Sequence, residues 1–452
     1  MLSASCDAST ITLDLSHQGL SQLPDLSVCT ALQHLNLDGN SLTELPDALF
    51  NLTELKSLSM RYNKLTKLSS EISKLSHLDK LDLAGNEVLW LPYQLFAMPS
   101  LSFLDVSYNN LTQLSTVISG MTGLTSLKAE HNYMYSLPWD IGSLTQLTHI
   151  YASHNKFTYL PPSIGQLGAL YHLDVSYNQL HDLPDTFGDL QSLVFLLLNS
   201  NNFNTLPSYI GELDSLETLY LSYNQLNSLP TELGDLSSLL ELYLDGNNLY
   251  SLPSSIGGLS NLQLLSADDN NLYNIAWEVG YLHNLLFLYL RSNQLSYLPD
   301  SFQYLTKLRQ LDITGNNISP SNLQQFLFQL PDLEVFNYDG KPSFQCDAAT
   351  TSMDLSYSNL FVFNFPDLSL CPNITELDLS GNRLERIPYT VFSLAKLTHL
   401  DASDNDIMVL AWEIEALQAL EYLDLSSNMI DGLPDTLGGL RSLHVLNPRN
   451  KA

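Results

Sequence analysis

Positive charge is scarce in this sequence. Of its 452 residues, 18 are Lys or Arg and 48 are Asp or Glu, which gives a formal net charge of −30. No Lys or Arg occurs from Phe157 to Leu290, whereas fourteen acidic residues do. A surface with this charge repels nucleic acid and anionic membranes, so we expect neither as a partner. Two explanations of the acidity stay open, namely solubility and the attraction of a basic partner.

Long apolar runs and catalytic motifs are also missing. No run reaches the roughly 18 apolar residues of a membrane helix, and the first residues, MLSASCDAST, lack the positive and apolar regions of a secretory signal. These absences predict a cytoplasmic protein, with an extracellular location as the alternative. The sequence has no P-loop, GxSxG, HExxH or CxxC motif, and no GxGxxG that opens a helix. We therefore expect no enzyme activity, no catalytic residue and no cofactor.

One motif fills the chain instead. An asparagine recurs every 23 residues from Asn40 to Asn316, and a shorter series follows at Asn382, Asn405 and Asn428. Each of these asparagines ends the pattern LxxLxLxxN, as in LYHLDVSYN at residues 170–178. A fixed period of this length with this motif is typical of a leucine-rich repeat solenoid.

The chemistry of one repeat predicts its path. In LxxLxL the leucines at alternating positions point inward, and the residues between them point outward. The asparagine amide can donate and accept, so it can satisfy backbone groups that the following turn leaves unpaired. The return segment reads LxxLPxxIGxL, in which Pro and Gly mark turns. We predict an α/β fold: a curved solenoid with a parallel sheet on its concave face and short helical or 3₁₀ turns on its convex face.

The repeats divide the chain into two blocks. The array is regular from about residue 21 to 316, except that Ser69, Ser115 and Ala276 replace the consensus proline. The period then slips, and residues 323–330 are candidates for a true helix. CDAATTSMDLSYSNL from Cys346 repeats the start of the array, CDASTITLDLSHQGL from Cys6. We predict a capped array at residues 1–341, a shorter block at residues 342–452 stacked on it, and a disturbance at 341–358.

The four cysteines fall into two pairs at these two starts. Cys6 precedes Cys29 by one repeat length, and Cys346 precedes Cys371 by a slightly longer spacing. Each pair should therefore lie on neighbouring coils of the solenoid. The sequence leaves two alternatives, which are buried thiols that act as small hydrophobic residues, and two cap disulfides, which would imply an oxidising compartment.

The consensus LxxLxLxxNxLxxLPxxIGxLxx covers nearly the whole chain. It resembles the intracellular leucine-rich repeat class, which includes the Ras-suppressor proteins, the Ras–Raf scaffolds, the Scribble-type polarity proteins and the repeat region of fungal adenylyl cyclase. The resemblance implies a non-catalytic scaffold that holds signalling proteins, often small GTPases or phosphatases, on its concave face. The chain departs from this class in its acidity, its duplicated cap and its lack of a recognisable flanking domain.

The outward strand positions carry many aromatic side chains with acidic neighbours. Open sheet faces seldom keep so many exposed rings without a use, and tyrosine is a common hot-spot residue in protein interfaces. The alternative is that aromatic residues simply suit strands. We predict a partner-binding surface formed by Phe103, Tyr108, Tyr151, His154, His172, Tyr177, Phe195, Tyr220, Tyr223, Tyr243, Asp245, Asp268, Phe287 and Tyr289, together with His131, His149, Asp105, Glu130, Asp174, Glu241 and Asp269.

Metal binding is the other use that these side chains suggest. Two histidine pairs, His131 with His154 and His149 with His172, recur one repeat apart and suit zinc by residue type. Three carboxylates at 245, 268 and 269 could meet on adjacent strands, but calcium needs six or more oxygens. Histidines on an open polar sheet are usually ordinary surface residues, so we predict no metal site.

These observations favour a protein-binding scaffold with a basic partner on its acidic, tyrosine-rich concave face. A secreted or surface protein that recognises a peptide or a glycan is the first alternative. The second alternative is the repeat region of a larger signalling enzyme, because such enzymes carry their catalytic domain outside the repeats.

Overall fold

The computed structural model describes residues 6–318, 330–333, 335–338, 349–358, 360, 365, 368 and 371–448. The chain divides into two compact units, Met1–Glu334 and Val335–Ala452. Most of the helix predicted at 323–330 and the first part of the predicted disturbance, residues 341–348, lie outside the described residues.

Each repeat contributes one short strand. In the first unit these strands are β1 Thr12–Asp14, β2 His34–Asn36, β3 Ser57–Ser59, β4 Lys80–Asp82, β5 Phe103–Asp105, β6 Ser126–Lys128, β7 His149–Tyr151, β8 His172–Asp174, β9 Phe195–Leu197, β10 Thr218–Tyr220, β11 Glu241–Tyr243, β12 Leu264–Ser266, β13 Phe287–Tyr289 and β14 Gln310–Asp312. The second unit has β15 Val335–Asn337, β16 Ser352–Asp354, β17 Glu376–Asp378, β18 His399–Asp401, β19 Tyr422–Asp424 and β20 Val445–Asn447.

A single 3₁₀ turn follows most strands on the return path. These turns are η1 Asp47–Asn51, η2 Ser70–Lys74, η3 Tyr93–Ala97, η4 Thr116–Gly120, η5 Ile141–Ser143, η6 Pro162–Gln166, η7 Asp185–Asp189, η8 Ser208–Glu212, η9 Thr231–Asp235, η10 Ser254–Gly258, η11 Trp277–Tyr281, η12 Asp300–Tyr304, η16 Tyr389–Ser393, η17 Trp412–Ala416 and η18 Asp435–Gly439. Among the described residues, no helix is long and apolar enough to cross a membrane.

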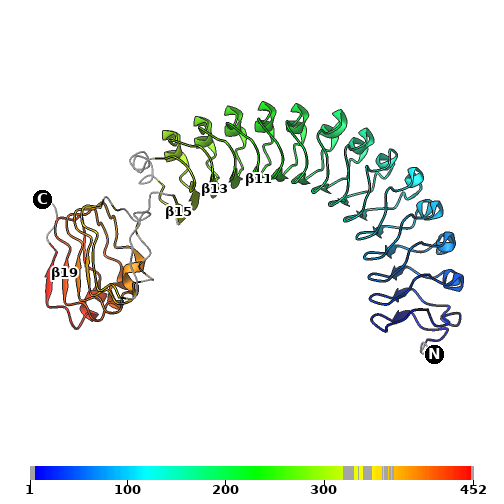
Figure 1. Ribbon diagram of the computed structural model, residues 1–452, viewed down its shortest axis with the longest axis horizontal. Helices are drawn as coiled ribbons and strands as arrows, with labels where there is room; N and C mark the ends of the chain where they lie inside the picture. Colours follow the sequence, from blue (N-terminus) through cyan, green and yellow to red (C-terminus); the bar gives the residue numbers. More distant parts are fainter. Residues whose placement is uncertain are drawn as a thin grey trace. The chain divides into compact units, whose positions relative to one another are not determined.

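The strands of the first unit form one parallel sheet in which β1 to β14 follow in chain order. From β2 onward neighbouring strands pair residues 23 positions apart, so that Tyr220 lies opposite Tyr243. The sheet lines the inner side of the curved coil and the 3₁₀ turns line the outer side (Figure 1). The second unit repeats this construction in the parallel sheet β16 to β20. The predicted α/β repeat solenoid is therefore confirmed.

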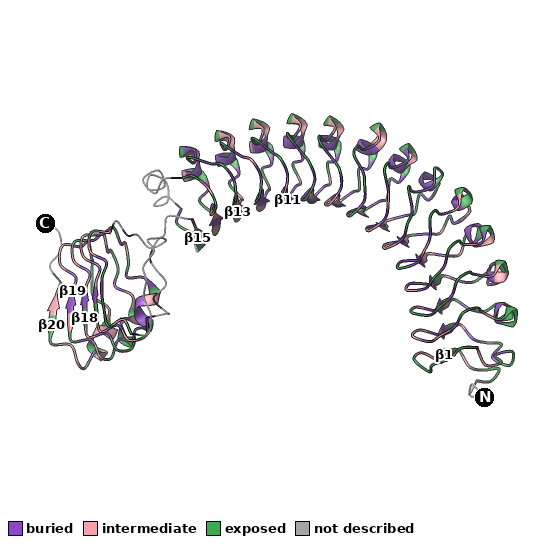
Figure 2. Cartoon of the chain, in the orientation of Figure 1, coloured by how far each residue is buried: buried purple, intermediate pink, exposed green. Residues whose placement is uncertain are grey.

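The core lies between the sheet and the 3₁₀ turns, as the buried residues in Figure 2 show. The inward residues of the motif, such as Leu170, Leu173 and Val175, are fully buried. Gly165 in η6 has no room for a Cβ, because the carbonyl oxygen of Thr186 in the next repeat lies where that atom would be. The glycine of the consensus therefore allows neighbouring turns to approach closely.

A ladder of buried asparagines joins each repeat to the one before it. The amide of Asn178 donates to the carbonyl oxygens of Ala152, Val175 and Ser176 at 3.1 Å each, and its oxygen accepts from the Phe157 N–H at 2.9 Å. Two of these four bonds reach back into the preceding repeat. The structure therefore contains the predicted hydrogen bonds between the asparagine side chain and the backbone groups at the turn.

A disulfide bond joins Cys6 to Cys29, with 5.6 Å between their Cα atoms. Cys371 is disulfide-bonded as well, and Cys346 lies outside the described residues. Of the two alternatives for Cys6 and Cys29, the structure therefore contains the bond rather than two thiols. The first bond ties the irregular first turn to the core, where Cys29 is fully buried.

Candidate functional site

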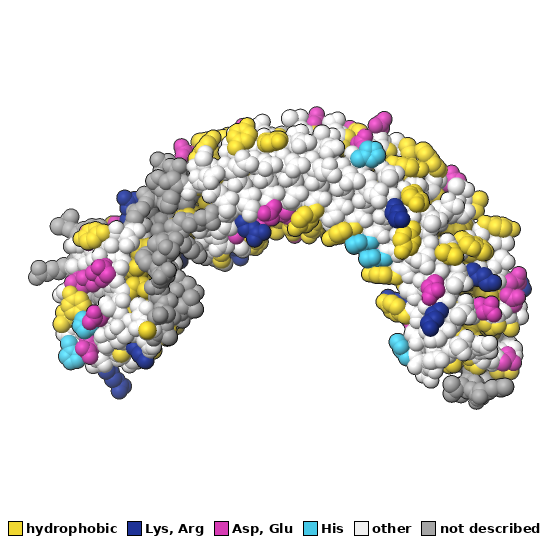
Figure 3. Space-filling view, viewed as in Figure 1, with side chains coloured by type: hydrophobic (Ala, Val, Ile, Leu, Met, Phe, Trp, Pro, Cys, Tyr) yellow, Lys and Arg dark blue, Asp and Glu magenta, His cyan; other side chains and the backbone are white. Residues whose placement is uncertain are grey.

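Of the side chains of the predicted binding surface, Asp105 is buried, and the others lie outside the core of the first unit. Tyr108, Tyr177 and Tyr223 are among the exposed members. Along the inner margin of this unit, hydrophobic side chains, histidines and a few charged groups lie next to one another (Figure 3). The fixed register of the sheet places residues that are far apart in sequence into rows across the strands.

The first row is a continuous stack of four rings. Tyr108, His131, His154 and Tyr177 each precede a ladder asparagine and have a left-handed φ between 51° and 55°. Their ring centroids follow at 4.2, 4.1 and 4.1 Å, with interplanar angles of 10° to 15°. The left-handed backbone directs each ring toward the equivalent residue of the next repeat, so four successive aromatic residues produce a stack.

A second cluster lies on β7 to β9. The ring of His172 is 6.0 Å from His149, 4.7 Å from Tyr151 and 5.7 Å from Phe195 between centroids. Tyr171 closes this cluster, at 5.8 Å from His149 and 5.4 Å from Phe195. The sequence prediction missed Tyr171, although the motif marks its position as outward.

A third group combines rings with carboxylates. Tyr220 and Tyr243 stack at 4.0 Å with an interplanar angle of 8°. The Tyr243 hydroxyl donates to Glu241 at 3.2 Å, and burial together with the hydrogen bond between Tyr243 and Tyr220 raises the Tyr243 pKa. This pair offers a flat apolar face with an acid at its edge.

Other predicted members stand apart from these groups. Phe287 and Tyr289 pair in register with Leu264 and Ser266 of β12, so this strand separates them from Tyr243. Phe103 lies opposite Lys80 and Ser126, and the Tyr223 ring lies against Gly246 of the next repeat. The predicted surface is therefore several groups of rings rather than one.

The acids near β11 to β13 form a chain of hydrogen bonds. Asp245 accepts from the hydroxyl groups of Ser222 and Ser266 and from the Asp268 N–H. Asp268 accepts from the Arg291 N–H at 2.7 Å, and the Arg291 guanidinium lies 3.8 Å from its carboxylate. These aspartates are thus oriented by protein donors. Within the described part of the chain, no three His, Cys, Asp or Glu side chains are gathered around a possible metal position.

Several of these groups titrate abnormally. Burial raises the pKa of Glu130, and the charges of Asp174 and Asp105 add to the rise. Burial lowers the pKa of His154 and of His172, and in each case the paired histidine lowers it further. Burial also raises the pKa of Asp82 and Asp268 to about 6. At neutral pH His154 and His172 are therefore mostly uncharged, while Asp82 and Asp268 keep most of their charge.

These aspartates predict a stability that rises on acidification. Both aspartates have a folded-state pKa of about 6, compared with about 3.9 in unfolded chains. At pH values between these two the folded protein therefore binds more protons than the unfolded chain does. Stability therefore falls as pH rises through this window. Between pH 7.5 and 5.5 we expect these two groups to contribute a gain of about 1 kcal/mol after solvent screening.

Urea unfolding at the two pH values measures this gain. The variant Asp82→Asn/Asp268→Asn cannot titrate at these positions. It should therefore lose the gain of about 1 kcal/mol that we assign to these two groups. A pH-dependent gain of the same size in the variant and the wild type would contradict the assignment.

Comparison with known proteins identifies the family to which this chain belongs. The model described as leucine-rich repeat region matches residues 135–245, and two further leucine-rich repeat models match residues 30–88 and 250–318, and residues 238–259, 373–394 and 419–440. The structure of a leucine-rich repeat protein of Leptospira interrogans is similar at 32% identity and a TM-score of 0.60. The alignment covers 74% of the present chain and 96% of the Leptospira chain. The chain belongs to the leucine-rich repeat proteins.

Two further structures extend the comparison. The leucine-rich repeat ectodomain of a plant membrane receptor kinase from Arabidopsis thaliana, in complex with Casparian strip integrity factor 2, is 28% identical with a TM-score of 0.56. That alignment covers 98% of this leucine-rich repeat chain but only 56% of the ectodomain. An internalin from Listeria monocytogenes, at 21% identity and a TM-score of 0.56 over 74% of this chain and 88% of its own, shows the shared fold alone. The comparison with curated protein sequences gave no significant match.

Proposed function

We propose that this leucine-rich repeat protein is a non-catalytic binding protein that takes a protein or peptide with a basic surface on its concave face. The single observation that carries the proposal is the Tyr220–Tyr243 stack beside Glu241, in a stretch of the chain without Lys or Arg. Aromatic faces supply apolar contact area, and uncompensated carboxylates steer a cationic partner toward them.

The neighbours in structure are consistent with this proposal. The plant ectodomain was determined in complex with Casparian strip integrity factor 2, so a repeat array similar to this one takes a partner. We further propose that the rings near β7 to β9 add to the same contact area. We also propose that the second unit, in which the sequence from Cys346 repeats the sequence from Cys6, is a shorter block of leucine-rich repeats with its own cap.

The deciding experiment removes both stacked rings. Proteins captured by the immobilised wild-type chain are identified by mass spectrometry, and their affinities are then measured for Tyr220→Ala/Tyr243→Ala. We expect binding to weaken by about 2 kcal/mol or more, because buried tyrosines are frequent hot spots. Raised salt should slow association.

A matched control uses tyrosines of the neighbouring repeats. Tyr250 and Tyr273 are each 55% exposed and follow the ladder asparagines outside the sheet, so Tyr250→Ala/Tyr273→Ala removes the same side chains from another surface. If this control loses the partners while the concave variant keeps them at unchanged affinity, the concave face is not the binding surface.

We propose that the protein resides in an oxidising compartment outside the cytoplasm. The Cys6–Cys29 bond carries this proposal, because disulfides persist in oxidising compartments and are rare in the cytosol. A second candidate is the cytoplasmic signalling scaffold that the resemblance to the intracellular repeat class implies. Titration of thiols in the denatured protein, purified from its native source without reductant, separates the two: no free thiol supports the first and four support the second.

A further inference from the structure

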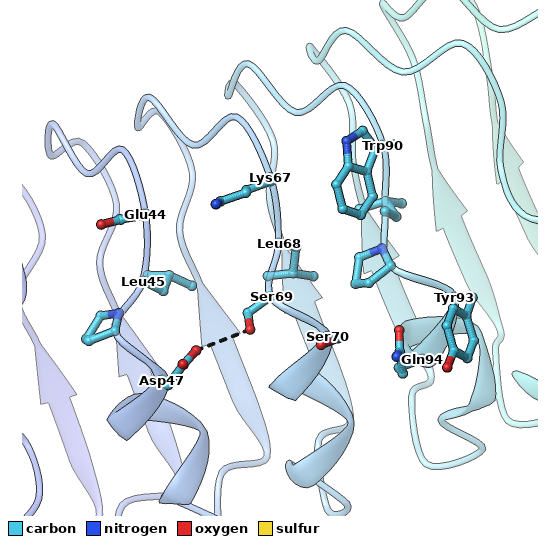
Figure 4. Close-up of a pocket in the computed structure, with 13 residues that line it drawn as sticks. Glu44, Leu45, Asp47, Lys67, Leu68, Ser69, Ser70, Trp90, Tyr93 and Gln94 are labelled. Atoms are coloured by element: carbon cyan, nitrogen blue, oxygen red, sulfur yellow. Dashed lines mark hydrogen bonds between the residues drawn. The ribbon is translucent and has the colours of Figure 1, made fainter.

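A groove of about 840 Å³ crosses three successive repeats on the flank of the first unit, where the chain passes from the sheet to η1, η2 and η3. This volume is in the range of ligand-binding clefts. Glu44, Lys67 and Trp90 occupy the same position in the three repeats and stand in a row beside it (Figure 4). The groove is separate from the concave surface.

The middle repeat of the groove departs from the consensus. Pro46 and Pro92 line it in the outer two repeats, whereas the equivalent residue between them is Ser69. The Ser69 hydroxyl accepts from the Glu71 N–H and donates to Asp47, both at 3.3 Å. The Ser69 side chain is smaller than a proline ring and is held by Glu71 and Asp47. A hollow is therefore left between Pro46 and Pro92, above the buried Leu68.

The two ends of the groove differ in chemistry. Trp90 and Tyr93 lie on the third repeat and are 56% and 68% exposed, so their faces are free to contact a ligand. Glu44 and Asp47 lie on the first repeat. One end thus offers aromatic faces, and the other offers two carboxylates.

Five of the lining groups can donate hydrogen bonds. The Trp90 indole, the Tyr93 hydroxyl, the Gln94 amide, the Ser70 hydroxyl and the Lys67 ammonium can all donate. A ligand that suits them presents acceptors and apolar surface but few donors. A proline-rich segment has this character, because proline lacks the N–H and the polyproline II helix leaves its carbonyl groups without internal partners.

The dimensions agree with this ligand. A polyproline II helix repeats every three residues with a rise of about 3.1 Å each, or about 9.3 Å per turn. Neighbouring strands are about 4.8 Å apart, so two repeats span about 9.6 Å at the sheet and somewhat more on the flank. Side chains one turn apart on such a ligand can therefore meet equivalent positions of the first and third repeats, across the hollow at Ser69.

We propose that this flank groove binds a proline-rich segment in the polyproline II conformation, with its prolines against Trp90 and Tyr93 and a basic residue at Glu44 and Asp47. Aromatic-lined grooves recognise such segments because the ligand is ordered before it binds and loses little entropy. The carboxylates at one end give the bound segment a direction.

The test uses a fluorescein-labelled peptide of eight prolines followed by two arginines, with fluorescence anisotropy as the readout. We expect saturable binding by the full chain, and a loss of at least about tenfold in Trp90→Ala. A peptide in which serines replace the prolines should bind at least about tenfold more weakly, because it keeps the charge without the preformed helix. Equal affinity for the two peptides, or no saturable binding, overturns the proposal.

Ser69→Pro provides the sharper variant. Ser69 has φ −66° and ψ 143°, close to Pro46 at −69° and 141°, so the backbone already suits proline. The substitution should retain or raise the melting temperature, yet fill the hollow and weaken the peptide at least about fivefold. Ser115→Pro, at φ −66° and ψ 145° in another repeat, is the matched control and should leave peptide binding unchanged. Unchanged binding in Ser69→Pro, or an equal loss in Ser115→Pro, would refute the groove as the site.

Discussion

Replacing Asn178 with alanine is expected to destabilise the first unit by about 1–3 kcal/mol. The change removes all four hydrogen bonds of this buried side chain and leaves the Phe157 N–H without its acceptor. The three carbonyl oxygens keep other donors, namely the amides of Asn155 and Asn201 and the His154 N–H. An unsatisfied buried group costs about 1–3 kcal/mol. Because each repeat contacts mainly its neighbours, the loss should begin in the repeats on either side of residue 178.

Urea melts at 25 °C followed by circular dichroism measure this effect, and hydrogen exchange locates it. Gln166→Ala is the control, because Gln166 is exposed on the neighbouring 3₁₀ turn. Melting curves that coincide for the two variants would show that the asparagine ladder does not stabilise the array.

Opening the first disulfide should have a comparable but localised effect. The Cys6–Cys29 bond closes a loop with a sequence separation of 23 residues, and a loop of that size corresponds to about 3 kcal/mol of stabilisation in the chain-entropy account. Cys6→Ser breaks the bond while Cys29 keeps its buried sulfur in the core. We expect β1 and β2 to lose protection against hydrogen exchange, while strands beyond β5 keep theirs.

Reductant supplies the control for this prediction. Treatment with dithiothreitol should bring the wild type to the stability of Cys6→Ser and leave the variant unchanged in the first repeats. If reduced and oxidised wild type show the same protection of β1 and β2, the bond is not what stabilises this end.

The sequence predicted the fold well because its signal is periodic and local. The recurrence of asparagine fixes the coil length, and the inward leucines fix which side of each strand is buried, so one repeat such as 170–178 predicts the others. The cysteine pairs were harder to interpret. Neighbouring coils bring Cys6 near Cys29 in either redox state, and the sequence pattern is the same for thiols and for a disulfide.

The candidate surface was predicted only in its outline. Outward positions follow from the motif, but the left-handed backbone at His131 and His154 does not, and it is this backbone that turns a column of aromatic residues into a stack. The flank groove was missed for a similar reason. The exchange of proline for Ser69 was visible, yet its consequence depends on the proline rings of the two adjacent repeats.

The asparagine ladder also bears on how such a chain can change in length. In the regular repeats each amide oxygen accepts from a residue 21 positions earlier, and each amide nitrogen reaches a carbonyl 26 positions earlier, as at Asn178, Asn201 and Asn224. A deletion or duplication of 23 residues, cut at equivalent points, leaves every donor with an equivalent acceptor. Unequal recombination can therefore add or remove whole turns while preserving the joint, and the chemistry of the exposed rows is then free to diverge from one copy to the next.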